Sequence, residues 1–104
     1  MKSNYQDQVF SVVKKIPQGK VATYGQVAAE LQSSKFKVQI SPRMVGWALH
    51  QNKDPKTPCH RVVDRNGRLA QNFAFGGWQE QKRRLEKEGI NFIDNQVELS
   101  RYRF

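Results

Sequence analysis

The chain has 104 residues, of which 38% are hydrophobic and 26% are charged. A chain of this length holds one modest core, so we expect a single domain over residues 1–104 and exclude a two-domain enzyme. The formal net charge of +9 favours a polyanionic partner, nucleic acid before an anionic membrane. No apolar run approaches the roughly 18 residues of a membrane span, and the first residues lack a signal-peptide apolar region, so we expect a cytoplasmic protein without membrane contact.

Two helices are predicted in the first third of the chain. Residues 5–16 have apolar residues at helical spacing, and a proline follows them. After a short extended or β-stretch, Thr23 can cap a second helix that runs from Tyr24 to Leu31. The expected inward residues are Val9, Phe10, Val13 and Ile16 in the first helix and Val27, Ala28 and Leu31 in the second.

A third predicted helix follows a polar loop at residues 32–40. Ser41 and Pro42 are typical of an N-cap and first helical position, and the helix runs to about His50. The order helix, loop, helix is that of a helix-turn-helix, although the loop of about nine residues is longer than the usual turn. Residues 31–68 hold eight basic and two acidic residues, a local net charge of +6. This density favours a DNA-binding surface over a merely solvated basic one.

The second half of the chain is predicted to alternate short strands with one helix. The sequence PCHRVV at 58–63 ends in β-branched residues, and Asn66-Gly67 then indicates a hairpin turn. A fourth helix follows two glycines, ends at Gly89, and has Trp78, Lys82, Leu85 and Glu86 on one face. The tail at 91–104 has alternation enough for one short strand at most.

Cys59 is the single cysteine, so it forms no internal disulfide and no thiolate-rich zinc site. The sequence has no phosphate-binding loop, dinucleotide fingerprint or metal-ligand cluster, and we expect no cofactor and no metal. His60 and Arg61 follow Cys59 directly, and such neighbours can lower a thiol pKa and create a nucleophile. Because adjacent residues of a strand point to opposite faces, His60 would act through a water or a bend. The alternative is a buried thiol beside a histidine with a core hydrogen bond.

PCHRVV resembles the active-site signature of the O6-alkylguanine-DNA alkyltransferases, which transfer an alkyl group from guanine O6 to a cysteine. Three further blocks resemble that family in order and spacing: IPQGKVATYGQVA at 16–28, PRMVGWAL at 42–49 and RLEKEG at 84–89. The resemblance implies a mainly α fold with small β structure, a winged helix-turn-helix DNA-binding domain with Cys59 beneath the recognition helix. It covers the family's DNA-binding domain without its amino-terminal domain. That length is typical of alkyltransferase-like proteins, which bind alkylated guanine and usually carry tryptophan instead of the cysteine.

The resemblance also implies roles for individual residues. Tyr24 would turn a backbone phosphate, and Arg43 would fill the space left by a flipped base. His60, oriented by Glu88, would withdraw the proton of Cys59 through water. The predicted site comprises the catalytic residues Cys59, His60, Glu88 and Asn52, the DNA-binding residues Tyr24, Arg43, Trp47 and Arg61, and the base-pocket residues Val62, Ala74 and Phe75.

Three departures from the family pattern leave two functions open. Ala74 and Phe75 stand where the family commonly has Tyr-Ser, Trp47 stands where it has a small residue, and QSSKFKVQISP is longer than its counterpart. We favour a monomeric, single-turnover repair enzyme acting on O6-alkylguanine in duplex DNA. The alternative is a non-enzymatic damage sensor that hands the lesion to nucleotide excision repair proteins. A winged-helix regulator without chemistry would leave the PCHRVV block unexplained.

Overall fold

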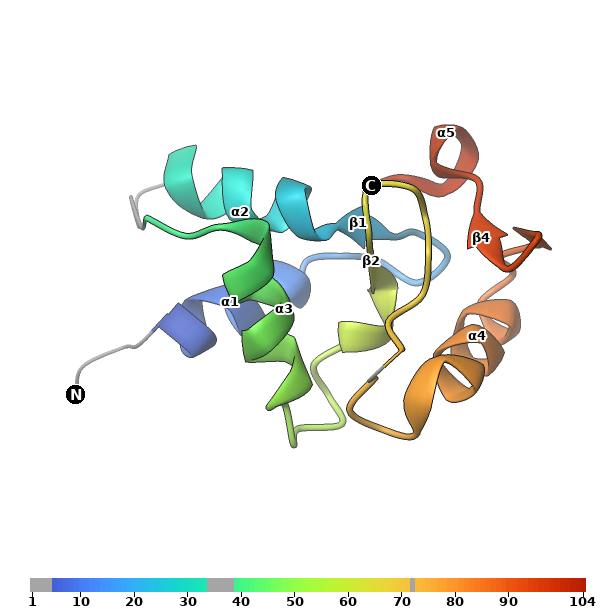
Figure 1. Ribbon diagram of the computed structural model, residues 1–104, viewed down its shortest axis with the longest axis horizontal. Coiled ribbons are helices and arrows are strands. Elements are labelled where there is room, and N and C mark those ends of the chain that lie inside the picture. The colour runs from blue at the N-terminus through green and yellow to red at the C-terminus, as the bar shows by residue number, and fades with distance from the viewer. Residues whose placement is uncertain (1–4, 34–38, 72) are drawn as a thin grey trace.

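The computed structural model describes residues 5–33, 39–71 and 73–104, which form mainly helices with two small sheets (Figure 1). The fold class is the predicted one. The elements in chain order are α1 (Tyr5–Val13), β1 (Ala22–Thr23), α2 (Tyr24–Ser33), α3 (Pro42–His50), the 3₁₀ helix η1 (Cys59–Arg61), β2 (Val62–Val63), α4 (Gly77–Lys87), β3 (Phe92–Ile93), β4 (Gln96–Val97) and α5 (Leu99–Tyr102). None of the helices in these ranges is both long and apolar enough to cross a membrane.

Both predicted helix caps are present. Thr23 Oγ1 accepts a hydrogen bond from the Gln26 backbone N–H at 3.0 Å, and Gln26 Oε1 accepts one from the Thr23 N–H at 3.3 Å. This reciprocal pair is a capping box. The Ser41 hydroxyl accepts a bond from the Met44 N–H at 3.2 Å, with a proline in the first turn of α3. The loop between α2 and α3 includes residues 34–38, which lie outside the described residues. The predicted length of this loop, and the positions of Lys35 and Lys37, therefore also lie outside them.

The helices α1, α2 and α3 pack around one hydrophobic core. The first helix ends at Val13, three residues earlier than predicted, because the chain turns at Lys14 and Lys15. Ile16 nevertheless remains buried. The core contains the predicted inward residues of α1 and α2, with Phe10 packed partly buried against it, and its other buried members include Ile40, Val45, Ala48, Leu49, Cys59, Val62 and Phe73. Cys59 is therefore part of the core that supports α3.

A parallel pair of short strands joins this core to the second half of the chain. Ala22 of β1 lies opposite Val62 of β2. Because Val62 directly follows η1 and Ala22 lies just before α2, this pairing brings the Cys59 turn close to Tyr24. A second buried cluster lies on the far side of β1 and β2, with the members Val21, Val63, Leu85, Ile90, Val97 and Tyr102.

The sequence predictions for residues 58–68 need correction in two places. Cys59–Arg61 forms a 3₁₀ turn and not a strand, closed by a bond from the Arg61 N–H to the Pro58 carbonyl at 3.0 Å. The Asn66-Gly67 turn exists, but it does not join two paired strands, since β2 pairs with β1. Asp64 Oδ1 accepts bonds from the Asn66 and Arg68 N–H groups, each at 2.8 Å, and holds the turn closed.

The C-terminal tail contains more structure than the predicted single strand. Its strands β3 and β4 form an antiparallel hairpin, and α5 follows. The turn between the strands is made by Asp94 and Asn95, both with positive φ. Asparagine and aspartate tolerate this conformation better than other non-glycine residues. Tyr102, 8% exposed, then anchors α5 to the second cluster.

Candidate active site and nucleic-acid interface

Cys59 lies in the wall of a small pocket beneath α3. Cys59 is 4% exposed, and the pocket has a free volume of about 30 Å3. The pocket brings together the start of α2, α3, the Cys59 turn and the segment before α4. Its lining consists of Tyr24, Gly46, Leu49, His50, Cys59, Ala70, Phe73 and Ala74. The cysteine can therefore meet only a group that enters this pocket.

Burial controls the protonation of Cys59. Removal from water raises the pKa of the thiol, while a hydrogen bond from the Asn52 side chain and the positive charge of Arg84 act in the opposite direction. The net shift is upward, because burial disfavours the thiolate more than these two groups favour it. Cys59 is thus mainly a thiol at neutral pH, and nucleophilic chemistry needs a base to take its proton.

Asn52 fixes the loop that connects α3 to Cys59. The residue is 4% exposed, and its Nδ2 donates to the Asp54 carbonyl at 3.1 Å and the Thr57 carbonyl at 3.4 Å. Its Oδ1 accepts from the Asp54 N–H at 2.9 Å. These bonds close the loop around the amide, and the same side chain reaches the Cys59 thiol.

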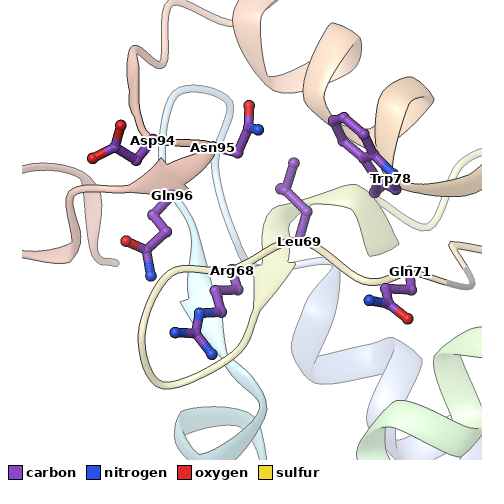
Figure 2. A pocket seen from close by; sticks show the side chains of 7 residues that line it. All are labelled: Arg68, Leu69, Gln71, Trp78, Asp94, Asn95 and Gln96. Atoms are coloured by element: carbon purple, nitrogen blue, oxygen red, sulfur yellow. The ribbon is translucent and has the colours of Figure 1, made fainter.

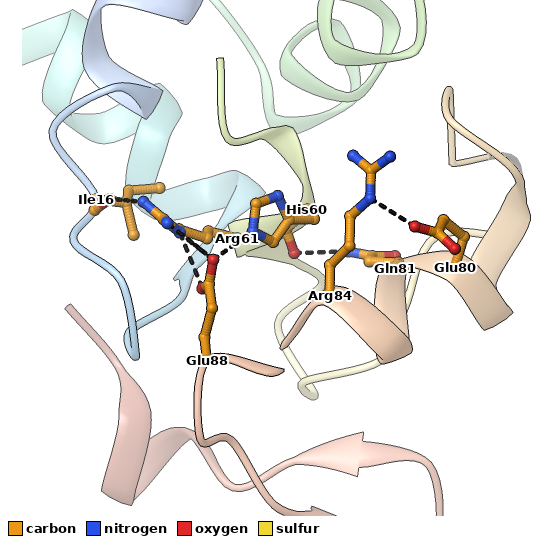
Figure 3. Close-up of polar contacts among 7 residues, drawn as sticks. All are labelled: Ile16, His60, Arg61, Glu80, Gln81, Arg84 and Glu88. Atoms are coloured by element: carbon orange, nitrogen blue, oxygen red, sulfur yellow. Dashed lines mark hydrogen bonds and ion pairs between the residues drawn. The ribbon is translucent and has the colours of Figure 1, made fainter. Parts of the chain in front are cut away.

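His60 and Arg61 share the carboxylate of Glu88 (Figure 3). His60 Nε2 and Arg61 Nη2 each lie 2.8 Å from Glu88 Oε2, and Arg61 Nε donates to Oε1 at 3.0 Å. The remaining arm of Arg61, Nη1, donates to the Ile16 carbonyl at 2.8 Å. Arg61 therefore connects the turn after Cys59 both to the residue that ends α4 and to the loop that follows α1.

This network sets the charges of its members. Burial alone would raise the pKa of Glu88, but the hydrogen bonds from Arg61 and His60 lower it below its ordinary value. Burial lowers the pKa of His60, which outweighs the attraction of Glu88. At neutral pH the carboxylate is charged and the imidazole neutral. A neutral imidazole can accept a proton.

The 3₁₀ turn separates the side chains of Cys59 and His60. Successive residues of such a helix project about 120° apart, so Cys59 faces the pocket while His60 faces Glu88. The structure thus brings together the predicted pair of His60 and Glu88 and orients Cys59 toward the pocket. Arg61, predicted to contact DNA, has its guanidinium bonded within the protein.

The predicted base-pocket residues occupy three different places. Ala74 lines the pocket together with Cys59. Val62 is buried in the strand pair at 1% exposure, and it is not part of the pocket lining. Phe75 lies behind the lining, where its ring centroid is 5.9 Å from that of Phe73.

Tyr24 connects the pocket to an open groove. Besides lining the Cys59 pocket, it borders a groove of about 520 Å3 whose other lining residues are Gly25, Pro42, Asp64, Arg65, Asn66 and Arg68. Burial, with smaller contributions from Asp64 and Cys59, raises the pKa of Tyr24 to about 12. Its hydroxyl is therefore protonated at neutral pH and can donate a hydrogen bond to an anion.

Arg43 and Trp47 lie four residues apart on the exposed side of α3. Residues at this spacing share one face of a helix. Trp47 is 62% exposed, the largest exposed fraction among the exposed large hydrophobic residues that the structure describes. It lines a hollow with Gly46, His50 and Ala70, three residues that also border the Cys59 pocket. The exposed face of α3 thus adjoins the entrance to this pocket.

Gln81 is a site residue that the sequence did not indicate. It is fully buried in α4, and its Nε2 donates to the His60 carbonyl at 3.2 Å, a bond drawn in Figure 3. The same Nε2 donates to the Val62 carbonyl at 3.0 Å. Its Oε1 accepts from the Ala70 N–H at 2.8 Å. One amide thereby joins the Cys59 turn to the segment that lines the pocket. The only sequence signal was its position four residues before Leu85 on a helix.

A separate hollow of about 380 Å3 lies between the start of α4 and the β3–β4 hairpin (Figure 2). Its lining contains Trp78 and Leu69 with the polar residues Arg68, Gln71, Asp94, Asn95 and Gln96. It shares no lining residue with the Cys59 pocket. Within the described ranges, no group of three or more histidine, cysteine, aspartate or glutamate residues is placed to hold a metal ion.

The three-helix core with its capped, exposed helix α3 defines a winged helix-like fold, and the Cys59 pocket lies below α3. Residues 4–90 match the family described as 6-O-methylguanine DNA methyltransferase, DNA binding domain. The chain belongs to this family.

Individual relatives include both transferases and alkyltransferase-like proteins. The chain is 32% identical to Alkyltransferase-like protein 1 of Schizosaccharomyces pombe over 92% of its own length and 83% of that protein. It is 38% identical to the methylated-DNA–protein-cysteine methyltransferase of Methanocaldococcus jannaschii over 83% of its length, but spans only 46% of that relative. The crystal structure of S. pombe Atl1 with damaged DNA containing O6-carboxymethylguanine superposes with a TM-score of 0.79 at 30% identity, covering 100% of this chain and 98% of that one.

Proposed function

We propose that this protein recognises O6-alkylguanine in duplex DNA by base flipping and repairs it through a single transfer of the alkyl group to Cys59. The observation that carries the proposal is the position of Cys59 in a pocket directly beneath the exposed helix α3, in the same turn as the His60–Glu88 pair. The relatives named as methyltransferases, and the structure of S. pombe Atl1 with damaged DNA, support a lesion as the ligand.

The first step is the extrusion of the base. The exposed face of α3 enters a groove of the duplex, and Arg43 occupies the space that the base leaves, bonding the unpaired cytosine. Trp47, on the same face, contacts the adjacent backbone. Tyr24 donates its hydroxyl to the phosphate of the rotated nucleotide, while Arg65 and Arg68 in the adjoining groove neutralise nearby phosphates.

The second step is a displacement at the alkyl carbon. Neutral His60 takes the Cys59 proton through a bridging water, with Glu88 stabilising the imidazolium that forms. The thiolate then attacks the alkyl carbon, forming a carbon–sulfur bond while the bond from that carbon to O6 breaks. The electron pair of the broken bond stays on the base, which takes up a proton and becomes guanine. The thioether is stable, so each protein molecule reacts once.

A damage sensor without chemistry is the second candidate, and the burial of Cys59 favours it. Burial raises the pKa of the Cys59 thiol, so little of the thiolate that transfer needs is present at neutral pH. A sensor would hold the lesion with the same groove and α3, and would present it to nucleotide excision repair proteins. Similarity to Alkyltransferase-like protein 1 over nearly the whole chain fits this alternative as well.

Intact-mass measurement separates the two candidates. The wild-type protein and Cys59→Ser are incubated with duplexes that differ only in O6-methylguanine or guanine. We expect the wild-type protein to gain the mass of one methylene from the lesion duplex alone. Cys59→Ser should gain none, because a serine hydroxyl stays protonated, yet should keep its lesion affinity because the pocket volume barely changes.

The other outcomes are equally decisive. Tight lesion binding by the wild-type protein without a mass gain would replace transfer by the sensor function. Equal affinity for the lesion and undamaged duplexes, together with no mass gain, would overturn both candidates.

A further inference from the structure

The pocket beside Cys59 is too small for the base it is proposed to receive. Its free volume of about 30 Å3 is less than a tenth of the 520 Å3 of the adjoining groove, whereas a purine with an alkyl group is far larger than a water molecule. Part of its lining must therefore move when a base enters. The wall formed by Phe73 and Ala74 belongs to no helix or strand, unlike the walls from α2 and α3.

One side chain of α4 holds this wall from behind. The guanidinium carbon of Arg84 lies 5.4 Å from the ring centroid of Phe73 and 5.0 Å from that of Phe75. These distances are typical of cation–π contacts. The two rings also contact each other at 57°, so Arg84 packs against both members of one aromatic pair.

Glu80 keeps Arg84 in this position. Its Oε2 accepts a hydrogen bond from Arg84 Nε at 2.8 Å, and Figure 3 shows this bond beside the His60–Glu88 network. Arg83 donates to the same carboxylate at 2.6 Å, but its side chain is 57% exposed. The Arg84 side chain is 31% exposed and faces the Phe73–Phe75 pair. Both arginines thus bond the Glu80 carboxylate, and Arg84 also contacts the Phe73 and Phe75 rings.

We propose that Arg84 is a positioning residue that sets the size of the O6-alkyl group accepted beside Cys59, because it holds Phe73 and Phe75 against α4. The inference rests on the proposed function, since it requires a flipped base in this pocket. A bulky alkyl group displaces the wall farther than a methyl group does. Loss of the Arg84 contact therefore favours binding of the bulky lesion more than binding of the small one.

The test compares Arg84→Ala with Arg83→Ala as a matched control. Both changes are made together with Cys59→Ser, so that no transfer consumes the protein, and Cys59→Ser alone is the reference. Affinities are measured for duplexes containing O6-methylguanine, O6-benzylguanine or guanine. From the strength of cation–π contacts, we expect Arg84→Ala to raise the ratio of benzyl to methyl affinity about 3- to 10-fold. Arg83→Ala should leave the ratio unchanged.

Each remaining outcome decides against a specific claim. Equal changes of both lesion affinities in Arg84→Ala would mean a purely structural role and would overturn the inference while leaving the proposed function intact. If the reference protein prefers neither lesion over guanine, the proposed function fails, and the inference fails with it. Arg84→Met, which keeps the length of the side chain, replaces Arg84→Ala if thermal unfolding shows that the alanine variant is not folded.

Discussion

Glu88 is a carboxylate at the end of α4 on which the turn after Cys59 depends. Its side chain is only 11% exposed and bonds both His60 and Arg61. A buried charge of this kind is stable only while its partners remain, and removing one member leaves the others unsatisfied. Glu88 thus supports the fold locally as well as orienting the imidazole proposed to act as a base.

The stability change from Glu88→Gln should depend on pH. At pH 7 we expect the free energy of unfolding to fall by about 1–3 kcal/mol, because Arg61 loses a charged acceptor. The folded-state pKa of Glu88 is lowered, so the carboxylate stabilises the fold above the unfolded-state pKa. That contribution disappears as pH falls through the folded-state pKa. Urea unfolding at pH 7 and at a pH low enough to protonate Glu88 should therefore show a large and then a much smaller difference in unfolding free energy between Glu88→Gln and the wild-type protein.

Glu86→Gln is the matched control, since Glu86 is exposed on the same helix two residues earlier. It should change the unfolding free energy by less than about 0.5 kcal/mol at either pH. Equal losses in the two variants, or an effect of Glu88→Gln that persists unchanged in acid, would contradict the role assigned to this network.

At the scale of elements, helix α3 has one side packed in the core and the opposite side exposed. Val45, Ala48 and Leu49 fix its inner side in the core, and Ser41 caps its start. The opposite side carries Arg43 in the first turn. A side chain held this way can project into a groove at a defined depth, since the helix that carries it is capped and packed on the core.

Arg43→Ala should weaken lesion binding more than binding to undamaged duplex. We expect a loss of about 10-fold on O6-methylguanine DNA and of about 2- to 3-fold on undamaged DNA, because only the flipped state leaves a space to fill. Arg65→Ala, in the groove beside Tyr24, serves as the control and should weaken both complexes equally. Fluorescence anisotropy with labelled duplexes measures the affinities of the wild-type protein and both variants for the two duplexes. Equal losses for Arg43→Ala would reduce Arg43 to a phosphate contact.

The elements that sequence could predict are those specified by short-range bonds. Thr23 and Ser41 cap helices through partners three residues away, so the residue types alone reveal them. The same holds for the inward faces of α1 and α2, which follow from periodicity. Pairing of His60 with Glu88 came from the family resemblance, because the two lie 28 residues apart.

Long-range polar contacts could not be predicted in the same way. Gln81 bonds residues 11 to 21 positions away, and nothing in a polar helix distinguishes a buried glutamine from a solvated one. Arg61 is among the residues predicted to contact DNA, yet its guanidinium bonds Glu88 and the Ile16 carbonyl. The 3₁₀ turn at Cys59 was interpreted as strand because the following valines are β-branched. Tertiary contacts decide all three cases.

Over the whole molecule, several acidic side chains pair with cations of the protein itself. Glu80 binds Arg83 and Arg84, and Glu88 binds Arg61. Their charges offset basic residues on the side of α4, whereas the groove beside α3 carries Arg65 and Arg68 with a single carboxylate, Asp64. The basic groove beside α3 is therefore expected to contact DNA phosphates.

This distribution predicts the salt dependence of DNA binding. Each phosphate neutralised contributes about −0.9 to the slope of log affinity against log salt, so contact with about five phosphates gives a slope near −4.5. Arg68→Ala should make the slope shallower by about one, because it removes one such contact from the groove. Lys87→Ala should leave the slope unchanged, since Lys87 is exposed at the far end of α4. Titrations of undamaged duplex between about 50 and 300 mM salt measure these slopes. An equally shallower slope in Arg68→Ala and Lys87→Ala would indicate that the net charge acts on DNA as a whole and not through contacts in the groove. A slope near zero in the wild-type protein would contradict the proposed phosphate contacts.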